Sequence, residues 1–284
     1  MKIVHSIEEL RTLILAYKKQ GETVGLVPTM GFLHQGHMSL VSRAKETCSK
    51  VVMSIFVNPL QFGPNEDFEK YPRNIERDSE MAKSHGVDIL FTPSVEEMYP
   101  TKALTTVLVS GITSRLCGSS RPGHFDGVAT VVTKLFNIVQ PHYAFFGLKD
   151  AQQVAVIEQM VHDLNMPIEI VPCEIVREED GLALSSRNVY LNKEERDQAL
   201  VLSAALKQAA EDLKKGISAE QVRTRVIQKI ESKPLAQIDY VELLNYPELT
   251  PVAECNGNPI ILALAVKFGN TRLIDNKIFS REGE

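Results

Sequence analysis

The feature that most constrains the fold of this chain is a regular alternation of apolar, β-rich runs and helix-periodic segments across its first 175 residues. The apolar runs are typical of buried strands and occupy residues 24–28, 51–57, 88–91, 143–146 and 168–171. The helical periodicity occupies residues 6–20, 36–49, 73–85, 127–139 and 151–164. Such alternation predicts an α/β fold: a Rossmann-like parallel sheet with helices on both faces.

The pattern changes after residue 176. A polar stretch at 177–181 precedes two helical segments, and strand-like runs follow them at 238–243 and 260–266. The helical segments occupy residues 193–215 and 219–232. These elements predict a smaller C-terminal α+β domain, so we expect two domains, at residues 1–175 and 176–284.

Composition and charge exclude several classes of protein. Hydrophobic residues make up 44% of the chain and charged residues 24%, which is enough to fill a core and too apolar for intrinsic disorder. The 31 basic and 36 acidic residues give a net charge of −5, which argues against a nucleic-acid partner held by phosphate neutralisation. A local basic pocket for one small anion is still compatible with this charge.

The cysteines and the apolar runs indicate the compartment. Cys48, Cys117, Cys173 and Cys255 are widely scattered, which favours buried free thiols in a reducing cytoplasm over disulfides. The apolar run at 259–266 is too short to span a bilayer, and the first residues lack the apolar region of a signal peptide. We expect a cytoplasmic protein without a membrane partner.

Residues 28–37 (PTMGFLHQGH) connect a predicted strand to a predicted helix. Backbone N–H groups at a helix N-terminus attract anions, and Gly31 and Gly36 allow a phosphate to approach the backbone closely. His34 and His37 can both be directed at this turn. Two histidines that only stabilise a loop, or a zinc-binding pair, are the alternatives, but the sequence contains no evident third ligand cluster. The pattern favours phosphate binding.

Three further segments carry polar side chains at comparable places. Asn58 and Gln61 follow the strand at 51–57 and are either ligand contacts or turn residues. Lys149 follows the strand at 143–146 and can bind polyphosphate, while Asp150 is either a ligand contact or a helix N-cap. Residues 184–188 (LSSRN) combine two hydroxyls with a guanidinium. These groups indicate that the protein stabilises a transition state at a nucleotide phosphate, with little covalent catalysis by its side chains.

The motifs together resemble a known family. The turn at 28–37 resembles the HIGH-type signature of nucleotidyltransferases and class I aminoacyl-tRNA synthetases, and residues 184–188 resemble the partner KMSKS loop in degenerate form. In combination and in order, the motifs are similar to those of the pantoate–β-alanine ligases; the others are residues 56–62 (FVNPLQF), 71–73 (YPR), 123–128 (GHFDGV) and 146–153 (FGLKDAQQ). The resemblance runs from about residue 1 to beyond residue 188, and the C-terminal part contributes less.

The resemblance implies an AMP-forming ligase. The carboxylate of pantoate would attack the α-phosphate of MgATP to give pantoyl adenylate and pyrophosphate, and the amine of β-alanine would then displace AMP to give pantothenate. Adenylation supplies a good leaving group, and burial protects the mixed anhydride from water. Mg²⁺ would arrive with ATP, so neither a protein metal ligand nor a prosthetic group is expected.

The resemblance also implies roles for single residues. His34, His37, Lys149 and Arg187 would be catalytic, with His37 as the proton donor and Arg187 neutralising pyrophosphate. Gln61 and Gln153 would bind pantoate, with Asn58 and His124 as further substrate contacts. The ATP site would comprise Met30, Gly31, Phe32, Leu33, His34, Gln35, Gly36, His37, Gly147, Leu148, Lys149, Asp150, Val176, Leu184, Ser185, Ser186 and Arg187. The second domain would act as a lid over the nucleotide.

A homodimer is implied by the resemblance alone. Two alternatives to the ligase stay open at this point. One is another HIGH-type nucleotidyltransferase that transfers a nucleotidyl group to a phosphate, and the other is a catalytically inert nucleotide-binding module. Retention of His34, His37, Lys149 and Arg187 argues against the inert module.

Overall fold

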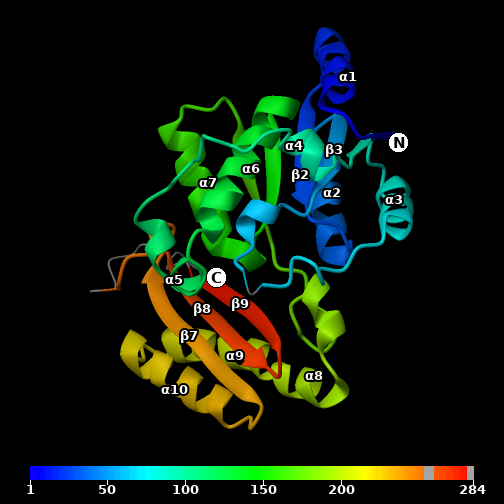
Figure 1. Cartoon of the computed structure of the whole chain (residues 1–284). Coiled ribbons are helices and arrows are strands. Elements are labelled where there is room, and N and C mark those ends of the chain that lie inside the picture. Colours follow the sequence, from blue (N-terminus) through cyan, green and yellow to red (C-terminus); the bar gives the residue numbers. More distant parts are fainter. Residues whose placement is uncertain (65, 253–258, 280–284) are drawn as a thin grey trace. The chain divides into compact units, whose positions relative to one another are not determined.

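The structure is a computed structural model that describes residues 1–64, 66–252 and 259–279. The chain forms a parallel sheet surrounded by helices and a second sheet, which has three strands (Figure 1). The strands are β1 (Lys2–Val4), β2 (Val24–Thr29), β3 (Lys50–Ile55), β4 (Ile89–Phe91), β5 (Tyr143–Gly147), β6 (Glu169–Cys173), β7 (Ala236–Asn245), β8 (Ile260–Phe268) and β9 (Thr271–Phe279). The α-helices are α1 (Ile7–Lys19), α2 (Gln35–Thr47), α3 (Ile75–Ser84), α4 (Val95–Met98), α5 (Leu116–Ser120), α6 (His124–Val139), α7 (Ala151–Asp163), α8 (Lys193–Ala199), α9 (Val201–Lys214) and α10 (Ala219–Glu231). Short 3₁₀ helices are η1 (Pro59–Gln61), η2 (Ile112–Ser114), η3 (Leu148–Asp150) and η4 (Ser186–Tyr190).

The six-stranded sheet confirms the predicted α/β fold. Its strand order is β1-β4-β3-β2-β5-β6, and every pairing is parallel. The chain moves outward from β2 through β3 and β4, and then starts again on the other side of β2 with β5 and β6. Ligands of such sheets bind beyond the carboxyl ends of the strands at this change of direction. The strand order therefore directs attention to the segments that follow β2 and β5.

Burial explains why β2 is a central strand. Its first four residues are buried, with Leu26 and Val27 pointing to opposite faces and both fully inaccessible to solvent. On the Val27 face, Met38 and Val41 of α2 join a core that also includes residues of β3, β4 and α3. Burying an apolar side chain of this size contributes about 1.5–3 kcal/mol. These contacts hold the N-terminus of α2 at the end of β2.

The second sheet contains β7, β8 and β9 in antiparallel order. Helices α9 and α10 pack against it, and their Leu202, Leu206 and Val226 share a core with Leu264 of β8. A smaller cluster joins Leu116 of α5 and Ala151 of α7 to β8. These elements form the small α+β structure that the sequence predicts.

Besides the short helices α4 and α5, which were not predicted, the structure differs from the predicted elements in three places. β1 was not predicted because it has only three residues. The predicted helix at 193–215 is two helices that meet at Leu200. β9 was not predicted because Asp275 and Asn276, both buried, interrupt its apolar pattern. Their partners are distant in sequence: Arg177 donates to Asp275 at 2.7 and 2.8 Å, and Asn276 donates to the carbonyl of Lys149 at 3.0 Å.

The described chain divides into two compact units. The first contains residues 1–110, 121–148 and 156–174, and the second contains residues 111–120, 149–155 and 175–284, of which 253–258 and 280–284 are outside the described part. The C-terminal segment of the second unit starts one residue before the predicted boundary, and two short segments of the predicted first domain are also counted with this unit. The predicted functional domains, nucleotide-binding at 1–175 and lid-like at 176–284, stay a prediction.

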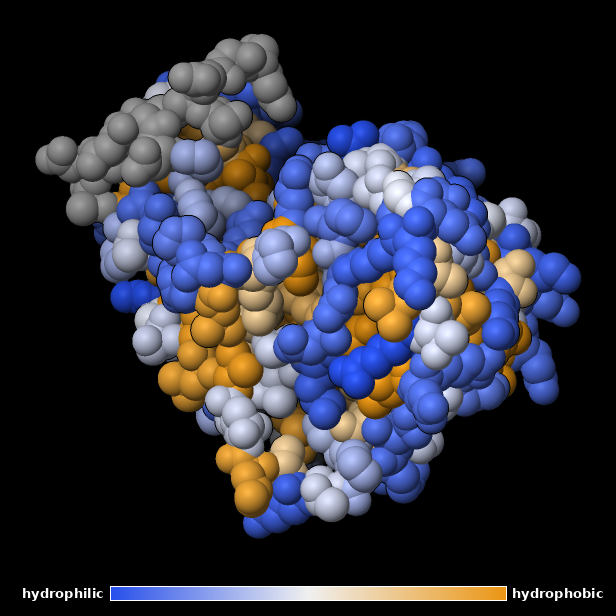
Figure 2. Space-filling view, turned by 90° about the horizontal axis from the view of Figure 1, so that it is seen from above, coloured by the Kyte–Doolittle hydropathy of each residue, from blue (hydrophilic) through white to orange (hydrophobic). Residues whose placement is uncertain are grey.

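Three cysteines confirm the prediction of buried free thiols. Cys48, Cys117 and Cys173 are unpaired and buried, and burial raises the pKa of Cys48 and of Cys173 to about 11. Cys255 lies outside the described residues. No helix of the described chain is long and apolar enough to cross a membrane. On the face shown in Figure 2, hydrophobic residues lie in separate patches bordered by hydrophilic ones.

Candidate active site

The turn between β2 and α2 has an unusual backbone. Gly31 has φ +85° and Phe32 has φ +48°, so two consecutive residues adopt the left-handed conformation. Gly31 is required here, because a Cβ atom would lie 2.9 Å from Ile55 Cγ2 and the positive φ disfavours other residues. Thr29 Oγ1 accepts a hydrogen bond from the Gly31 N–H at 3.2 Å and donates to the Ser54 carbonyl at 2.7 Å. The turn is thus tied to β3.

His34 and His37 form the N-terminal cap of α2. Nδ1 of His34 accepts from the Gly36 N–H at 3.1 Å, and Nδ1 of His37 accepts from the His34 N–H at 3.2 Å. The ring centroids are 4.1 Å apart. Because a backbone N–H can only donate, both Nδ1 atoms lack a proton, and each neutral ring carries its proton on Nε2. Two Nε2–H donors therefore belong to the N-terminus of a 13-residue helix, where the dipole also favours an anion.

Gln61 is held in place by a network at the end of β3. Asn58 caps η1, donates to Gln61 Oε1 at 3.3 Å and to the Gly127 carbonyl at 3.1 Å, and accepts from the Tyr99 hydroxyl at 2.9 Å. Gln61 Nε2 donates to the sulfur of Met30 at 3.1 Å. Asn58 is only 1% exposed, and these contacts engage its amide and hold the side chain of Gln61.

His124 supports the same segment from α6. Its Nδ1 lies 2.8 Å from the Gln61 carbonyl, which can only accept, while Arg121 donates to Nε2 at 3.0 Å. His124 is therefore the Nδ1–H tautomer, the opposite of His34 and His37. Arg121 also forms a two-pronged ion pair with Glu66 at 2.6 Å. Burial alone would raise the pKa of Glu66, but the hydrogen bonds and charge of Arg121 keep it below its ordinary value.

Gly127 allows α6 to approach η1 closely. A Cβ atom at this position would overlap the backbone of Leu60 and would lie 2.6 Å from the Gln61 nitrogen. Backbone atoms cannot rotate away as a flexible side chain can. Glycine is therefore required for the position of Gln61.

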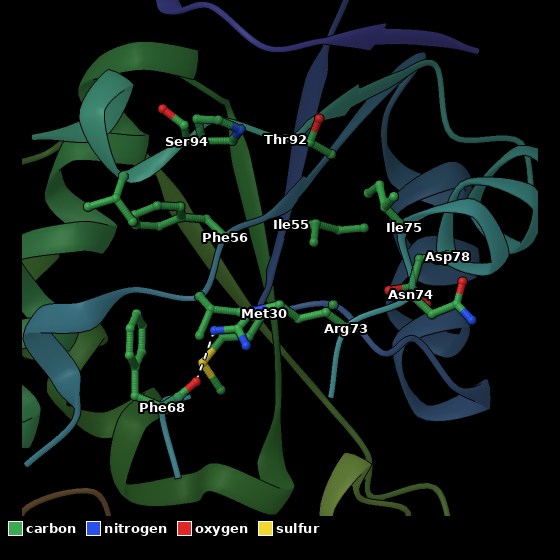
Figure 3. Close-up of a pocket in the computed structure, with 14 residues that line it drawn as sticks. Met30, Ile55, Phe56, Phe68, Arg73, Asn74, Ile75, Asp78, Thr92 and Ser94 are labelled. Carbon is green, nitrogen blue, oxygen red and sulfur yellow. Dashed lines mark hydrogen bonds between the residues drawn. The ribbon is translucent and has the colours of Figure 1, made fainter. Parts of the chain in front are cut away.

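A cavity of about 270 Å³ lies beyond the carboxyl ends of β3 and β4 in the first unit. Figure 3 shows Asn74, Ile75 and Asp78 on one side of it and Phe56 and Ser94 on the other. The dashed line in the figure joins Arg73 to the Phe68 carbonyl, a hydrogen bond of 2.9 Å. The full lining is Met30, Gly31, Ile55, Phe56, Val57, Phe68, Arg73, Asn74, Ile75, Asp78, Thr92, Pro93, Ser94 and Val95.

The second unit carries the segment that follows β5. Lys149 Nζ lies 3.6 Å from Asp150 Oδ2. The neighbouring Gln152 is buried and links α7 to the segment at 111–117: it accepts from the Cys117 N–H at 3.0 Å and donates to two backbone carbonyls, those of Ile112 at 2.9 Å and Arg115 at 2.8 Å. This anchor fixes the first turn of α7, on which Gln153 is half-buried.

The other predicted ATP contacts of the second unit come together around a turn at 176–184. The Leu184 N–H donates to the Val176 carbonyl at 3.0 Å, and Gly181 closes the turn with φ +95°. Ser185 then caps η4 by accepting from the Arg187 N–H at 3.3 Å, and Ser186 is buried. Val176 and residues 184–187, which are separate in the sequence, are therefore neighbours.

Five residues that hold the predicted site residues in place by hydrogen bonds were not identified from the sequence. In the first unit, Tyr99 and Arg121 hold the Gln61 segment, and Arg77 and Asp78 hold the turn before His34. In the second unit, Gln152 holds the start of α7. Gln152 lies within the motif quoted at 146–153 and Arg121 lies two residues before the motif at 123–128, and these positions were the only sequence signals for the five residues.

Comparison with known proteins identifies the relatives of this chain. The sequence profile described as pantoate-beta-alanine ligase matches residues 2–278. A pantothenate synthetase of Acetivibrio thermocellus is 57% identical over 279 residues, covering 98% of this chain and 99% of that protein. One from Pelotomaculum thermopropionicum is 56% identical over 282 residues, covering 99% and 100%.

Solved structures agree with these sequence matches. The crystal structure of pantothenate synthetase from Thermus thermophilus has a TM-score of 0.92 at 46% identity and covers 98% of this chain and 99% of that chain. A pantoate-beta-alanine ligase from Francisella tularensis, described as complexed with beta-gamma ATP and beta-alanine, has a TM-score of 0.79 at 35% identity. It covers 100% of this chain and 99% of that one.

Proposed function

The chain belongs to the pantoate–β-alanine ligase family, and we propose how its residues carry out the reaction of that family. The protein is a ligase of pantothenate biosynthesis that condenses pantoate with β-alanine, with ATP as the third substrate. The match over residues 2–278 carries this conclusion. The histidine-capped helix at the end of β2 supports a nucleotide site at this turn.

We propose that the reaction passes through pantoyl adenylate. A carboxylate oxygen of pantoate attacks the α-phosphorus of ATP, and the bond from that phosphorus to pyrophosphate breaks. The β-alanine amine then attacks the acyl carbon, AMP leaves with the bonding electrons, and the amine loses a proton. Negative charge increases on the leaving pyrophosphate in the first step, so donors aimed at phosphate oxygens stabilise its transition state.

In the first unit, His34 and His37 act on the nucleotide as neutral Nε2–H donors. Both Nδ1 atoms accept from backbone N–H groups, and this tautomer places the protons on the Nε2 atoms, from which they can be donated to phosphate oxygens. Residues 30–37 and 147–148 form the ATP contacts of this unit, with His37 as the proton donor implied by the family. The N-terminus of α2 adds its dipole to the same charge stabilisation.

Gln61 binds pantoate, because a neutral amide can both donate to a carboxylate and accept from a hydroxyl. Asn58 and His124 contribute to pantoate binding by fixing the Gln61 side chain and carbonyl, respectively. In the second unit we assign Gln153 to pantoate, and the ATP contacts to Lys149, Asp150, Val176, Leu184, Ser185, Ser186 and Arg187. Lys149 and Arg187 supply positive charge for the phosphates.

Mg²⁺ enters as the partner of ATP. Among the residues that the structure describes, no group of three or more His, Cys, Asp or Glu side chains could hold a metal. Phosphate oxygens and water are the usual ligands of Mg²⁺ in nucleotide sites, and no protein ligand is assigned. The cytoplasmic location stays a prediction.

A homodimer is also proposed, as the family resemblance implies. Residues 102–110 form neither helix nor strand, and within them Leu104 is 94% exposed and Leu108 is 67% exposed. Covering such exposed apolar side chains is favourable, so we place the dimer contact on this segment. Light scattering should give a dimeric mass for the wild type and a monomeric mass for the double variant Leu104→Glu, Leu108→Glu, whereas a monomeric wild type would rule the dimer out.

Isotope exchange between ATP and labelled pyrophosphate tests the proposed first step. The reaction needs the carboxylate but not the amine, so exchange should occur with pantoate in the absence of β-alanine. Lys149→Ala should slow it by about 10²–10³-fold, the usual loss on removing one transition-state donor. Isotope exchange in the absence of any acid would contradict the adenylate route. Formation of ADP in place of AMP in the complete reaction with β-alanine would contradict it as well.

A further inference from the structure

A buried carboxylate of α3 holds the turn that leads to His34. Asp78 is 1% exposed, and none of the catalytic or substrate-binding roles proposed above uses it. Its Oδ2 accepts from the Phe32 N–H at 2.6 Å, and its Oδ1 accepts from the Leu33 N–H at 2.8 Å. One side chain therefore binds two consecutive backbone N–H groups, 45 and 46 residues away in sequence.

The backbone of the turn explains why these two N–H groups need a common acceptor. Gly31 and Phe32 are left-handed, and successive N–H groups in turns of this kind form a concave nest that attracts an anion. Leu33 is fully buried, so water cannot satisfy its N–H. Phe32 is not a glycine and has no intrinsic preference for φ +48°, so its conformation depends on outside contacts such as this carboxylate.

Arg77, on the same turn of α3 as Asp78, also binds the turn at residues 31–33. Its Nη2 donates to the Leu33 carbonyl at 2.8 Å, and its guanidinium lies 5.0 Å from the centre of the Phe32 ring. Arg77 Nη1 is also 3.5 Å from Asp78 Oδ1. The two side chains thus bind the N–H and the C=O of Leu33, the residue that directly precedes the helix cap.

We propose that Asp78, assisted by Arg77, is a positioning residue for the ligase reaction. By fixing the backbone at 31–33, the Asp78 carboxylate sets where His34 begins α2, and with it the Nε2–H groups of His34 and His37. This inference rests on the proposed role of these histidines at the phosphates. A displacement of about 1 Å in a catalytic group can cost about 10²-fold in rate, so a change at Asp78 acts on turnover and not only on stability.

Asp78→Asn tests the proposal, because the amide keeps the size of the side chain but can accept from only one of its ends. Asp212→Asn is the matched control: Asp212 is a buried carboxylate of α9 that lies 3.2 Å from Arg225 and accepts from Gln208 at 3.2 Å. Urea unfolding would be compared with kcat and with KM for pantoate and ATP. We expect both variants to lose stability, but only Asp78→Asn to lose about 10–100-fold in kcat, with pantoate KM changed less than about threefold.

A double variant with His37→Ala separates positioning from a general weakening of the fold. If Asp78 acts through both histidines, Asp78→Asn should slow the His37→Ala enzyme by less than it slows the wild type, because only the part of its effect that passes through His34 remains and residues that act together are non-additive. A full additional loss in the double variant would overturn the proposal, as would a folded Asp78→Asn enzyme with nearly normal kcat. If His37→Ala itself is fully active, the proposed function of the histidines fails instead.

Arg77→Met tests the positioning proposal if the Asp78→Asn enzyme does not fold. Arg77 is 42% exposed at its side chain, so its loss should leave the fold intact while it removes the donor to the Leu33 carbonyl. We expect a kcat loss of about 3–10-fold for a partial displacement of the turn. An unchanged kcat in the folded Arg77→Met enzyme would overturn the proposal.

Discussion

The Nδ1 atom of His37 accepts a hydrogen bond from the backbone N–H of His34 at 3.2 Å, and the two imidazole rings lie 4.1 Å apart. The same residues therefore begin a helix and present proton-bearing nitrogens. The capping role and the donor role of these histidines can be separated by substitutions that keep one role and remove the other.

His34→Asn should keep the cap and remove the imidazole. Asparagine is among the best N-cap residues, so the free energy of unfolding should stay near that of the wild type, whereas His34→Ala should lose about 1 kcal/mol. Both variants should lose about 10²–10³-fold in kcat if the Nε2–H donates to phosphate. Urea unfolding and steady-state kinetics would check the two effects. A His34→Asn enzyme with normal kcat would show that His34 serves only as a cap.

Gly127→Ala should displace Gln61. The added Cβ meets the backbone of Leu60 and the nitrogen of Gln61, and such overpacking typically costs about 1–3 kcal/mol. We expect KM for pantoate to rise while the calorimetric affinity for ATP is kept. Gly63→Ala is the control, since its Cβ would make an ordinary contact of 3.7 Å with Glu66. Equal effects of the two substitutions on pantoate KM would argue against the close approach of α6 and η1.

The ion pair of Glu66 and Arg121 should stabilise the enzyme in a pH-dependent way. Because the folded pKa of Glu66 lies below its ordinary value of 4.5, the contribution is fully present above about pH 4.5 and is lost as pH falls through the lowered value. Glu66→Gln should therefore be less stable than the wild type at pH 7, by about 0.5–1 kcal/mol for this partly exposed pair. Chemical unfolding across the acid range would measure the difference, which should vanish at the lowest pH. A difference independent of pH would exclude the ion pair as its source.

The ion pair of Arg177 with the buried Asp275 should be costly to break. Asp275 accepts from both guanidinium nitrogens and from the Asn276 N–H at 2.8 Å. Asp275→Ala should cost about 3 kcal/mol, at the low end for a buried ion pair, because it leaves the partly buried guanidinium of Arg177 without its partner. Joint replacement by Arg177→Met and Asp275→Leu should recover much of that loss. Thermal unfolding would compare the variants, and a double variant no better than Asp275→Ala would contradict this explanation.

Periodicity and motif spacing predicted the parallel sheet and the turn that carries His34 and His37, because both depend on residues close in sequence. The strand order could not be predicted in the same way, since it depends on packing between strands far apart in the chain, such as β2 and β5. β9 shows a related limit. Asp275 looks like a surface residue until Arg177 is found beside it in space.

The supporting residues of the site were hidden for the same physical reason. Asp78 lies in a polar helical segment, where a carboxylate is normally solvated, and only the fold brings it to the N–H groups of Phe32 and Leu33. Asn58 was predicted from its place after a strand, but its amide contacts Gln61, Gly127 and Tyr99. Sequence patterns thus indicated which segments matter, and the contacts indicated what each side chain does.

The central claim is that the reaction passes through pantoyl adenylate. It is tested most directly by following a carboxylate oxygen of pantoate into the products. Pantoate labelled with ¹⁸O in its carboxylate would be converted with ATP and β-alanine, and the phosphorus products analysed by mass spectrometry. Because the carboxylate oxygen stays on phosphorus when the amine displaces AMP, one ¹⁸O atom should appear in each AMP. Unlabelled AMP, or ¹⁸O in inorganic phosphate together with ADP, would contradict the adenylate route.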